Sequence, residues 1–407
     1  MTELLVQKYL RSGKTLEELH QDHGVKSYVC NGKIGLNYDM IEAKNTDPVA
    51  CECRGLILRE GSYDIVACPM FRFFNMEQGD VAAKIDWNQA AFEEKIDGSA
   101  IIVYNFQNKW MCGTRGRPEA DGTIDDGDLK FSDLVEAAVH AMNPGKNLQD
   151  LMNDMQSVET DPDGSLVKAA DRTFVFELTS PVNRIVCKYQ TIKLTLLAVR
   201  NNKNLKEESP EGWELESYGL TTPKLYDFNN INHMIQVVRE WNPEDHEGVV
   251  VKDFNFNRIK VKSPSYCAFN KMRDSLSTSL RGCIEVILLG KDDDVIPMMP
   301  DMIAKRIVAL KPLVREVLKQ TERDYAELKD IEDMKTFAFS AKEKLWPAAL
   351  FALKRNKTPD LKTFSLGNDR GAGAKIPSNA TNTMLELCRK VSPEVVGGLK
   401  LSIVPSE

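Results

Sequence analysis

Lys95 has a side chain and a setting in the sequence that could serve nucleophilic chemistry. It begins the tetrapeptide Lys-Ile-Asp-Gly, which separates an acidic segment from an apolar run at residues 100–104. This pattern predicts two strands joined by a turn. A lysine amine can attack the α-phosphorus of a nucleoside triphosphate if cationic neighbours or a metal ion lower its pKa and free its lone pair. Because many surface turns contain K-x-D-G, this chemistry is predicted only if the rest of the chain supplies partners.

Two carboxylates and two further lysines, all on predicted strands, could be those partners. Glu177 alternates with three larger hydrophobic residues, which places its carboxylate on the opposite face of its strand. Glu247 precedes a second apolar strand, and both carboxylates could bind ribose hydroxyls or a metal ion. Lys260 and Lys262 alternate with aliphatic residues. They would form a compact clamp for a transferring phosphoryl group.

Each residue also has a simpler interpretation, which the order of the set argues against. Glu177 could be an exposed strand carboxylate, and the paired lysines could be the solvent face of an edge strand. Lys95 and Glu177 are 82 residues apart, Glu177 and Glu247 are 70 apart, and Glu247 and Lys260 are 13 apart. This order is similar to that of the covalent nucleotidyltransferases, the superfamily of ATP-dependent DNA and RNA ligases and mRNA capping enzymes.

Four segments resemble one branch of that superfamily, the T4 RNA ligase 1 family of phage RNA ligases that repair broken tRNA. They are E-C-R-G at residues 52–55, P-M-F-R-F-F-N at 69–75, P-V-N-R-I-V at 181–186 and K-V-K-S at 260–263. Two positions differ from the family. Arg72 stands where the family commonly has lysine, and the family segment K-S-K-G corresponds here to G-T-R-G, which includes Arg115 but lacks the first basic group.

The resemblance implies a role for each matched residue. Lys95 would become lysyl-AMP, Asp97 and Gly98 would shape its turn, and Arg54 would hold the leaving pyrophosphate. The catalytic residues are expected to be Lys95, Asp97, Lys260 and Lys262. The ATP-binding residues are expected to be Arg54, Arg72, Lys95, Gly98, Arg115, Glu177, Glu247, Lys260 and Lys262.

Four carboxylates are expected as metal ligands: Glu177, Glu247, Asp293 and Asp294. The last two belong to the acidic triplet at residues 292–294, which could instead be a solvated turn or a helix N-terminus. Magnesium is implied because triphosphate chemistry requires neutralisation of charge on the attacking and leaving oxygens.

The function implied is that of an ATP-dependent RNA ligase with ATP and Mg²⁺ as cofactors. Its partner would be RNA with 5'-phosphate and 3'-hydroxyl ends, expected to be nicked tRNA, in the cytoplasm of a phage-infected bacterium. The alternatives are a DNA ligase, a GTP-using capping enzyme, or an RNA-binding module without activity. The first two usually have a strand-rich domain after the paired lysines.

The pattern of the whole chain predicts an α+β protein with two domains. Residues 1–263 read as antiparallel strands with helices at about 2–10, 131–142, 147–157 and 229–240, whereas residues 264–407 have helical periodicity. The total net charge is -7, divided into -11 for the first part and +4 for the second. The helical part is therefore the candidate RNA-contacting domain, and the candidate contacts are Lys305, Arg306, Lys354, Arg355 and Lys357.

Other motifs and segments are expected not to contribute chemistry. Residues 12–15 read Ser-Gly-Lys-Thr but lack the earlier glycine of a phosphate-binding loop, so end-healing by a kinase or phosphatase is expected from a separate enzyme. Two tight metal-ligand spacings, Cys51-x-Cys53 and His20-x-x-His23, lack the second pair of a zinc site. Nine cysteines, no signal sequence and no long apolar run favour a cytosolic protein with free thiols, expected to be a monomer without membrane contact.

Overall fold

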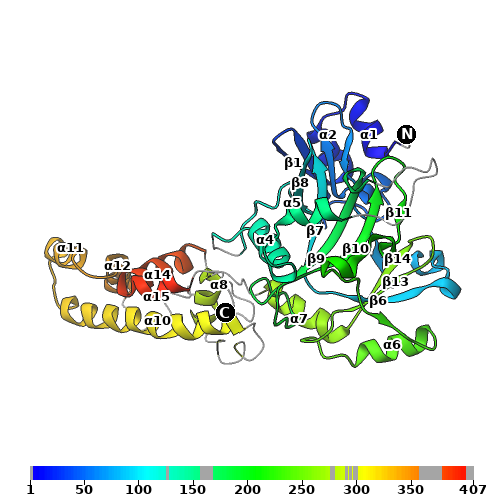
Figure 1. Ribbon diagram of the computed structural model, residues 1–407. Helices are drawn as coiled ribbons and strands as arrows, with labels where there is room; N and C mark the ends of the chain where they lie inside the picture. Colours follow the sequence, from blue (N-terminus) through cyan, green and yellow to red (C-terminus); the bar gives the residue numbers. More distant parts are fainter. Residues whose placement is uncertain are drawn as a thin grey trace. The chain divides into compact units, whose positions relative to one another are not determined.

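The computed structural model describes residues 3–124, 128–155, 168–275, 280–288, 301–356 and 378–399, with Asp292 and Ile296. The chain divides into two compact units. The first comprises Met1–Ile124 and Leu129–Ala268, and the second comprises Phe269–Glu407 with Asp125–Asp128. Within the described ranges, every strand belongs to the first unit and the second unit is helical (Figure 1). The predicted α+β class, with antiparallel sheets followed by helices, is confirmed.

The first sheet has the order β1-β2-β3-β4 and is antiparallel throughout. Its strands are β1 (Val25–Cys30), β2 (Lys33–Tyr38), β3 (Arg54–Arg59) and β4 (Ile65–Ala67). The helices α1 (Leu5–Arg11), α2 (Leu16–His23) and α3 (Pro48–Glu52) pack with this sheet around a shared apolar core. Arg54, the predicted pyrophosphate ligand, is the first residue of β3.

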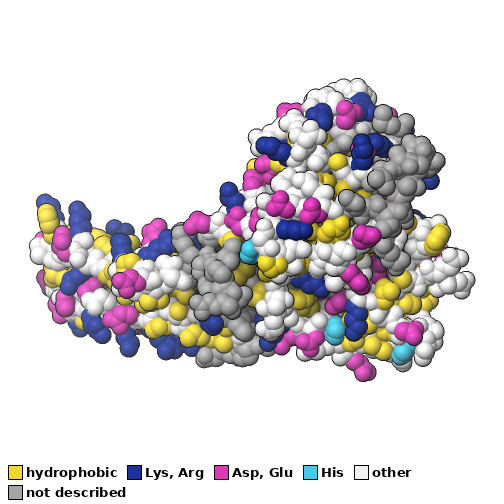
Figure 2. All heavy atoms as spheres, viewed as in Figure 1, with side chains coloured by type: hydrophobic (Ala, Val, Ile, Leu, Met, Phe, Trp, Pro, Cys, Tyr) yellow, Lys and Arg dark blue, Asp and Glu magenta, His cyan; other side chains and the backbone are white. Residues whose placement is uncertain are grey.

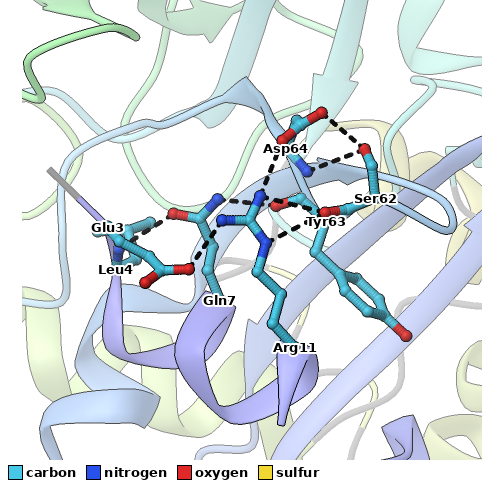
Figure 3. A network of polar contacts seen from close by, with 7 residues as sticks. All are labelled: Glu3, Leu4, Gln7, Arg11, Ser62, Tyr63 and Asp64. Atoms are coloured by element: carbon cyan, nitrogen blue, oxygen red, sulfur yellow. Dashed lines mark hydrogen bonds and ion pairs between the residues drawn. The ribbon is translucent and has the colours of Figure 1, made fainter. Parts of the chain in front are cut away.

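Polar contacts fix α1 to the turn between β3 and β4 (Figure 3). The Arg11 guanidinium donates to the carbonyl of Ser62 and to Asp64, and the Gln7 amide donates to the carbonyl of Tyr63 at 2.7 Å. At the other end of α1, the Glu52 carboxylate accepts from the backbone N–H groups of the first turn at 3.0 and 3.1 Å. The glutamate of the E-C-R-G segment is therefore a helix cap, which satisfies donors that a helix leaves unpaired.

The second sheet has the order β11-β10-β9-β7-β8 and is also antiparallel. Its strands are β7 (Ser99–Phe106), β8 (Lys109–Thr114), β9 (Arg172–Thr179), β10 (Lys193–Asn201) and β11 (Glu207–Glu208). Phe174, Phe176 and Leu178 of β9 are buried, and so is Val175 on the opposite face. Because both faces of β9 are covered, Glu177 lies in an enclosed environment.

The third sheet has the order β12-β6-β13-β14-β5. Its strands are β5 (Phe74–Asn75), β6 (Ala91–Lys95), β12 (Leu225–Tyr226), β13 (Gly248–Lys252) and β14 (Arg258–Lys262). Only the β14–β5 pairing is parallel. β14 lies between β13 and β5, so Lys260 and Lys262 are not on an edge strand.

Four more helices complete the first unit or lead from it. They are α4 (Phe131–Met142), α5 (Leu148–Asp154), α6 (Ile231–Arg239) and α7 (Pro264–Ser275). The predicted helices at 2–10, 131–142, 147–157 and 229–240 thus correspond to α1, α4, α5 and α6. The sequence reading missed α2 and α3. Thr15 of the Ser-Gly-Lys-Thr segment is the N-cap of α2 and accepts from the Glu18 N–H at 3.1 Å.

The second unit has its own apolar core, formed mainly by one long helix and its neighbours. The helix α10 (Asp301–Leu328) packs against α8 (Leu280–Leu288), α12 (Pro347–Asn356) and α14 (Ser378–Val391) (Figure 1). Two shorter helices, α11 (Met334–Lys342) and α15 (Pro393–Gly398), pack at their sides. None of the helices in the described ranges is long and apolar enough to cross a membrane.

One predicted RNA contact of the second unit is wrong. Arg306 is only 2% exposed, and its Nε donates to the carbonyl of Leu399, because its position on α10 faces the core rather than solvent. Lys305 and Arg355 are exposed, and Lys354 Nζ donates to the carbonyl of Lys329. Lys357 lies outside the described residues.

Candidate active site

Strand register in the third sheet aligns the predicted nucleophile with its partners. Gly248 of β13 pairs with Lys95 of β6 on one side and with Lys262 of β14 on the other. Glu247 directly precedes Gly248. A Cβ atom on Gly248 would lie 2.2 Å from the carbonyl oxygen of Val261, and its φ of 157° favours glycine. The row Lys95–Gly248–Lys262 thus depends on the absence of a side chain at its centre.

The Glu247 carboxylate bridges the two lysines of this row. Its Oε2 lies 2.7 Å from Lys95 Nζ, and its Oε1 lies 2.8 Å from Lys262 Nζ. Burial lowers the pKa of Lys95, but the charges of Glu247, Glu177 and Asp97 outweigh burial and leave this pKa raised. In the protein alone, carboxylates dominate around the amine, so the lowering of the Lys95 pKa that nucleophilic attack requires stays a prediction for the protein with ATP or a metal ion bound.

Lys260 occupies a cationic part of the site, together with Arg54 and Arg115. Burial lowers the pKa of Lys260 to about 7, helped by the charges of Arg54 and of the neighbouring lysines. Burial and the charge of Arg115 lower the pKa of Arg54 to about 10. The Phe73 ring lies 4.6 Å from Lys260 Nζ and 5.3 Å from the Arg54 guanidinium carbon. Among the described contacts, Lys260, Arg54 and Arg115 form no ion pair, and cations held close together in this way suit a polyanion.

Glu177 belongs to the second sheet, and the Lys95 turn connects that sheet to the third. Burial raises the pKa of Glu177 to about 7, an effect that Lys95 opposes and Glu247 reinforces. Gly98 allows this approach, because a Cβ atom there would lie 2.4 Å from the Leu178 carbonyl oxygen and 3.1 Å from Glu177 Cγ. The geometry therefore brings Glu177 toward Lys95.

Asp97 is buried and serves as an anchor for its turn. Its Oδ2 accepts from the N–H groups of Val186 and Cys187 at 2.7 and 2.8 Å, and its Oδ1 accepts from the Tyr266 hydroxyl at 2.6 Å. The Asp97 N–H donates to the Tyr189 hydroxyl at 3.0 Å. Both carboxylate oxygens of Asp97 are thus engaged by donors of the protein, and its expected catalytic role stays a prediction.

Arg72 contacts Tyr38 of β2 and the loop that follows this strand. Its guanidinium carbon lies 4.0 Å from the centre of the Tyr38 ring, and its Nη2 donates to Asn45 at 2.6 Å. It does not belong to the Lys95–Gly248–Lys262 row, although Phe74, whose ring it contacts, pairs with β14. Its predicted contact with ATP stays a prediction.

Sequence reasoning missed three aromatic residues that shape the site: Phe73, Tyr189 and Tyr266. Phe73 lies within a recognised segment but has no polar atom. Tyr189 and Tyr266 are distant from Asp97 in sequence. The only available signal was their position just after the P-V-N-R-I-V and K-V-K-S segments.

The site could hold a divalent cation through its carboxylates, since hard cations prefer oxygen ligands. Glu177 has no ion pair among the described contacts, whereas both oxygens of Glu247 are paired with lysines. The described residues contain no cluster of three or more potential His, Cys, Asp or Glu ligands. Asp293 and Asp294 lie outside these residues. Asp292 is buried and ion-paired with Lys311, so it is not a solvated turn residue.

Comparison with known proteins gives a family match over the same region. The family model described as RNA ligase matches residues 52–266, which include every residue of the site. A putative bifunctional polynucleotide kinase/RNA ligase of Autographa californica nuclear polyhedrosis virus is 28% identical over 289 residues. That match covers 68% of this chain but only 39% of the viral protein.

Two further proteins are similar over different lengths. A putative RNA ligase of Thermovibrio ammonificans is 23% identical over 334 residues, covering 76% of this chain and 78% of its own. A solved RNA ligase of Naegleria gruberi, with ATP and Mn, is 12% identical with a TM-score of 0.32, covering 48% of this chain and 54% of its own. Because the family match spans more than half of the sequence and contains the complete site, the chain belongs to the T4 RNA ligase 1 family of RNA ligases.

Proposed function

We propose that this protein is an ATP-dependent RNA ligase that joins RNA 5'-phosphate and 3'-hydroxyl ends through an AMP attached to Lys95. The observation that supports this most directly is the Glu247 bridge between Lys95 and Lys262. A nucleophilic amine on β6, a cation on β14 that could bind phosphate, and a carboxylate directly before the intervening strand β13 that could accept the proton of the amine lie side by side. Covalent transfer of a nucleotidyl group requires this combination.

The proposed reaction has three steps. In the first, Lys95 Nζ attacks the α-phosphorus of ATP, a P–N bond forms, the bond to pyrophosphate breaks, and the amine loses its proton. In the second, a 5'-phosphate oxygen of RNA attacks the same phosphorus, the P–N bond breaks, and Lys95 leaves as an amine that takes up a proton. In the third, the RNA 3'-hydroxyl attacks the activated 5'-phosphorus, AMP leaves, and the hydroxyl proton is released. The AMP attached to the RNA 5'-phosphate is thus a good leaving group for the sealing step.

Lys95 must lose a proton before the first step. Its raised pKa means that the amine is an ammonium ion in the protein without ATP. Glu247 Oε2, at 2.7 Å, is the oxygen placed to accept that proton. Lys260, Lys262 and Arg54 would bind the phosphates and stabilise the charge that develops on them.

A divalent cation, Mg²⁺ in this proposal, would bind at Glu177 and Glu247. It would supply neutralisation of phosphate charge. Binding of a cation or of ATP phosphates near these carboxylates would weaken their hold on the Lys95 proton. Glu177, whose pKa of about 7 reflects its burial, would be stabilised as a carboxylate by such a cation.

The substrate proposed is nicked tRNA, with the helical second unit providing RNA specificity. This follows from family membership and from the net charge of +4 over residues 264–407. End-healing to a 5'-phosphate and a 3'-hydroxyl would come from a separate kinase and phosphatase, in the cytoplasm of a phage-infected bacterium.

The test begins with α-labelled ATP or GTP, magnesium and the purified full chain, followed by denaturation. We expect label on wild-type protein from ATP alone. Lys95→Arg keeps the cation beside Glu247 but cannot supply a free amine, because arginine does not deprotonate in proteins, so it should carry no label. Lys109→Ala, an exposed lysine of the same unit, is the matched control and should label normally.

Different outcomes identify the alternatives. Label from GTP would indicate capping chemistry. Label from ATP followed by sealing of nicked DNA but not of RNA would indicate a DNA ligase. No label from either nucleotide, on protein shown by mass to be free of bound AMP, would leave an inactive RNA-binding module.

A further inference from the structure

The helix α11 presents an aromatic residue to solvent between two lysines. Phe339 is 78% exposed, although most large aromatic side chains of the described chain are buried or half-buried. Lys335 precedes it by four residues and Lys342 follows it by three, so all three side chains lie on one face of the helix. The Lys342 ammonium lies 5.9 Å from the centre of the Phe339 ring. We refer to these three residues as the α11 face.

The α11 face is held rigidly from the opposite side of the helix. Phe337 and Ala341 are fully buried, and the Phe337 ring packs edge-on against Phe351 of α12 at 5.5 Å. The Asp333 carboxylate caps the N-terminus of α11 by accepting from the Thr336 N–H at 2.8 Å. Exposure of Phe339 is therefore fixed by the packing of the helix, not by the absence of an anchor.

The charges beside Phe339 indicate what would cover it. Within the described contacts, neither Lys335 nor Lys342 forms an ion pair, whereas Lys344 on another side of the same region pairs with Asp324 and Glu327. One carboxylate, Glu343, follows Lys342. Figure 2 shows many Lys and Arg side chains, with some acidic side chains among them, over the end of the second unit where α11 lies. Unpaired cations around an exposed ring match an anionic partner that has flat apolar groups.

We propose that the α11 face binds single-stranded RNA, with one unpaired base stacked on Phe339 and the adjacent phosphates bound by Lys335 and Lys342. Aromatic stacking flanked by cations is how proteins bind single strands with little sequence preference. A base in a duplex has no free face to offer to the ring. The inference rests on the proposed function, because it assumes that RNA is the substrate of this ligase.

The test measures binding of a fluorescent single-stranded RNA to the full chain. We expect Phe339→Ala to weaken binding by roughly five- to a hundredfold, the range produced by loss of one stacked base, and Phe339→Trp to retain it. Lys335→Gln with Lys342→Gln should reduce the salt dependence of log K by about 1.4 in slope, for two phosphates on a single strand. Melting temperatures should change little, because the substituted side chains are exposed.

The matched control is Phe254→Ala. Phe254 is 77% exposed, but it lies in the turn between β13 and β14 beside Asp253 and has no described lysine contact. RNA binding of this variant should equal that of the wild type. Equal losses for Phe254→Ala and Phe339→Ala would overturn the inference, since they would reflect general loss of apolar surface.

Three other results would also overturn it. They are wild-type RNA affinity of Phe339→Ala, equal affinity of the wild type for duplex and single-stranded RNA, and a wild-type dimer that Phe339→Ala converts to a monomer. Failure of the proposed function is distinguishable, because it would appear as absence of ATP-derived label on wild-type Lys95, in an assay that contains no RNA.

Discussion

At the scale of single residues, the site is defined by two opposing effects on the pKa of Lys95, namely burial and the charges of nearby carboxylates. Lys95 is enclosed, which favours the neutral amine, yet three carboxylates keep it protonated. Among the three carboxylates, Glu247 raises the pKa of Lys95 most. The same carboxylate contacts Lys262, so the nucleophile and a phosphate ligand share one partner.

We expect the rate of lysyl-AMP formation to rise with pH, because only the deprotonated amine is nucleophilic. Glu247→Gln removes the main charge that raises the pKa of Lys95, so the acid limb of the pH profile should move to lower pH. The maximal rate should fall, because Lys262 also loses its partner. Single-turnover labelling from pH 6 to 10 measures both effects. An acid limb at the wild-type position would contradict this account of the Lys95 pKa.

Glu177 should destabilise the folded protein at alkaline pH. Its folded-state pKa of about 7 lies above the ordinary value of 4.5. The contribution of this side chain to folding stability is therefore complete below pH 4.5 and is lost as pH rises through 7. Glu177→Gln should therefore raise the melting temperature at pH 9 but hardly at pH 4. We expect about 2–4 °C for each kcal/mol relieved. An equal change at both pH values would show that burial of charge is not the cause.

At the scale of elements, strand register determines which residues meet. Gly248 aligns β6, β13 and β14 so that Lys95 and Lys262 flank one position. The turn at Asp97 then connects β6 of the third sheet to β7 of the second. These two features place Lys95 of β6, Lys262 of β14 and Glu177 of β9 around the Glu247 carboxylate.

Gly248→Ala should abolish lysyl-AMP formation. The new Cβ atom would overlap the Val261 carbonyl oxygen, which is backbone and cannot move without breaking the β13–β14 pairing. We expect a loss of about 3 kcal/mol or more in unfolding free energy, measured by urea denaturation. Gly122→Ala is the control, because its Cβ atom would meet only ordinary contacts of 3.7 Å and longer. Comparable losses in the two variants would disprove a specific role for Gly248.

Tyr266→Phe should loosen the turn of Lys95. It removes a buried hydrogen bond to the Asp97 carboxylate, which contributes about 1.5–3 kcal/mol when the acceptor is charged. We expect lower stability and slower lysyl-AMP formation, with a smaller effect on the apparent affinity for ATP. Tyr218→Phe is the control. It removes an exposed hydroxyl contact with the carbonyl of Asp154 and should change neither the stability nor the rate of lysyl-AMP formation. A wild-type rate for Tyr266→Phe would mean that the turn is held without this bond.

At the scale of the whole molecule, the two units differ in composition and in secondary structure. All described strands and the whole candidate site lie in the first unit, whereas the second is helical and has a separate core. The excess of basic residues belongs to the second part of the sequence. This division is consistent with separate tasks of nucleotide chemistry and RNA binding.

All nine cysteines are free in the structure, and Cys267 is the one that is exposed. We expect a thiol reagent to modify Cys267 rapidly in the native protein and all nine cysteines after denaturation. A reducing agent should leave the melting temperature unchanged, because no disulfide constrains the unfolded chain. A drop in melting temperature on reduction would reveal a disulfide and contradict the free-thiol structure.

The sequence by itself determined the chemical types in the site and the two-part fold class. The sequence sufficed to recognise Lys95, Glu177, Glu247, Lys260 and Lys262. The order of these residues resembles that of a known superfamily, and strand periodicity is a local property of the chain. The helices α1, α4, α5 and α6 were predicted for the same reason. The helix α2 was missed, although Thr15 and Glu18 form a capping box that could have indicated it.

Only the tertiary structure decided how these residues interact. That Glu247 bridges Lys95 and Lys262, that carboxylates raise the pKa of Lys95, and that Tyr266 holds Asp97 all depend on contacts between residues distant in sequence. The burial of Arg306 and the exposure of Phe339 likewise depend on which helix face meets the core. Electrostatic effects follow distance and burial in space, and the spacing of residues along a chain specifies neither.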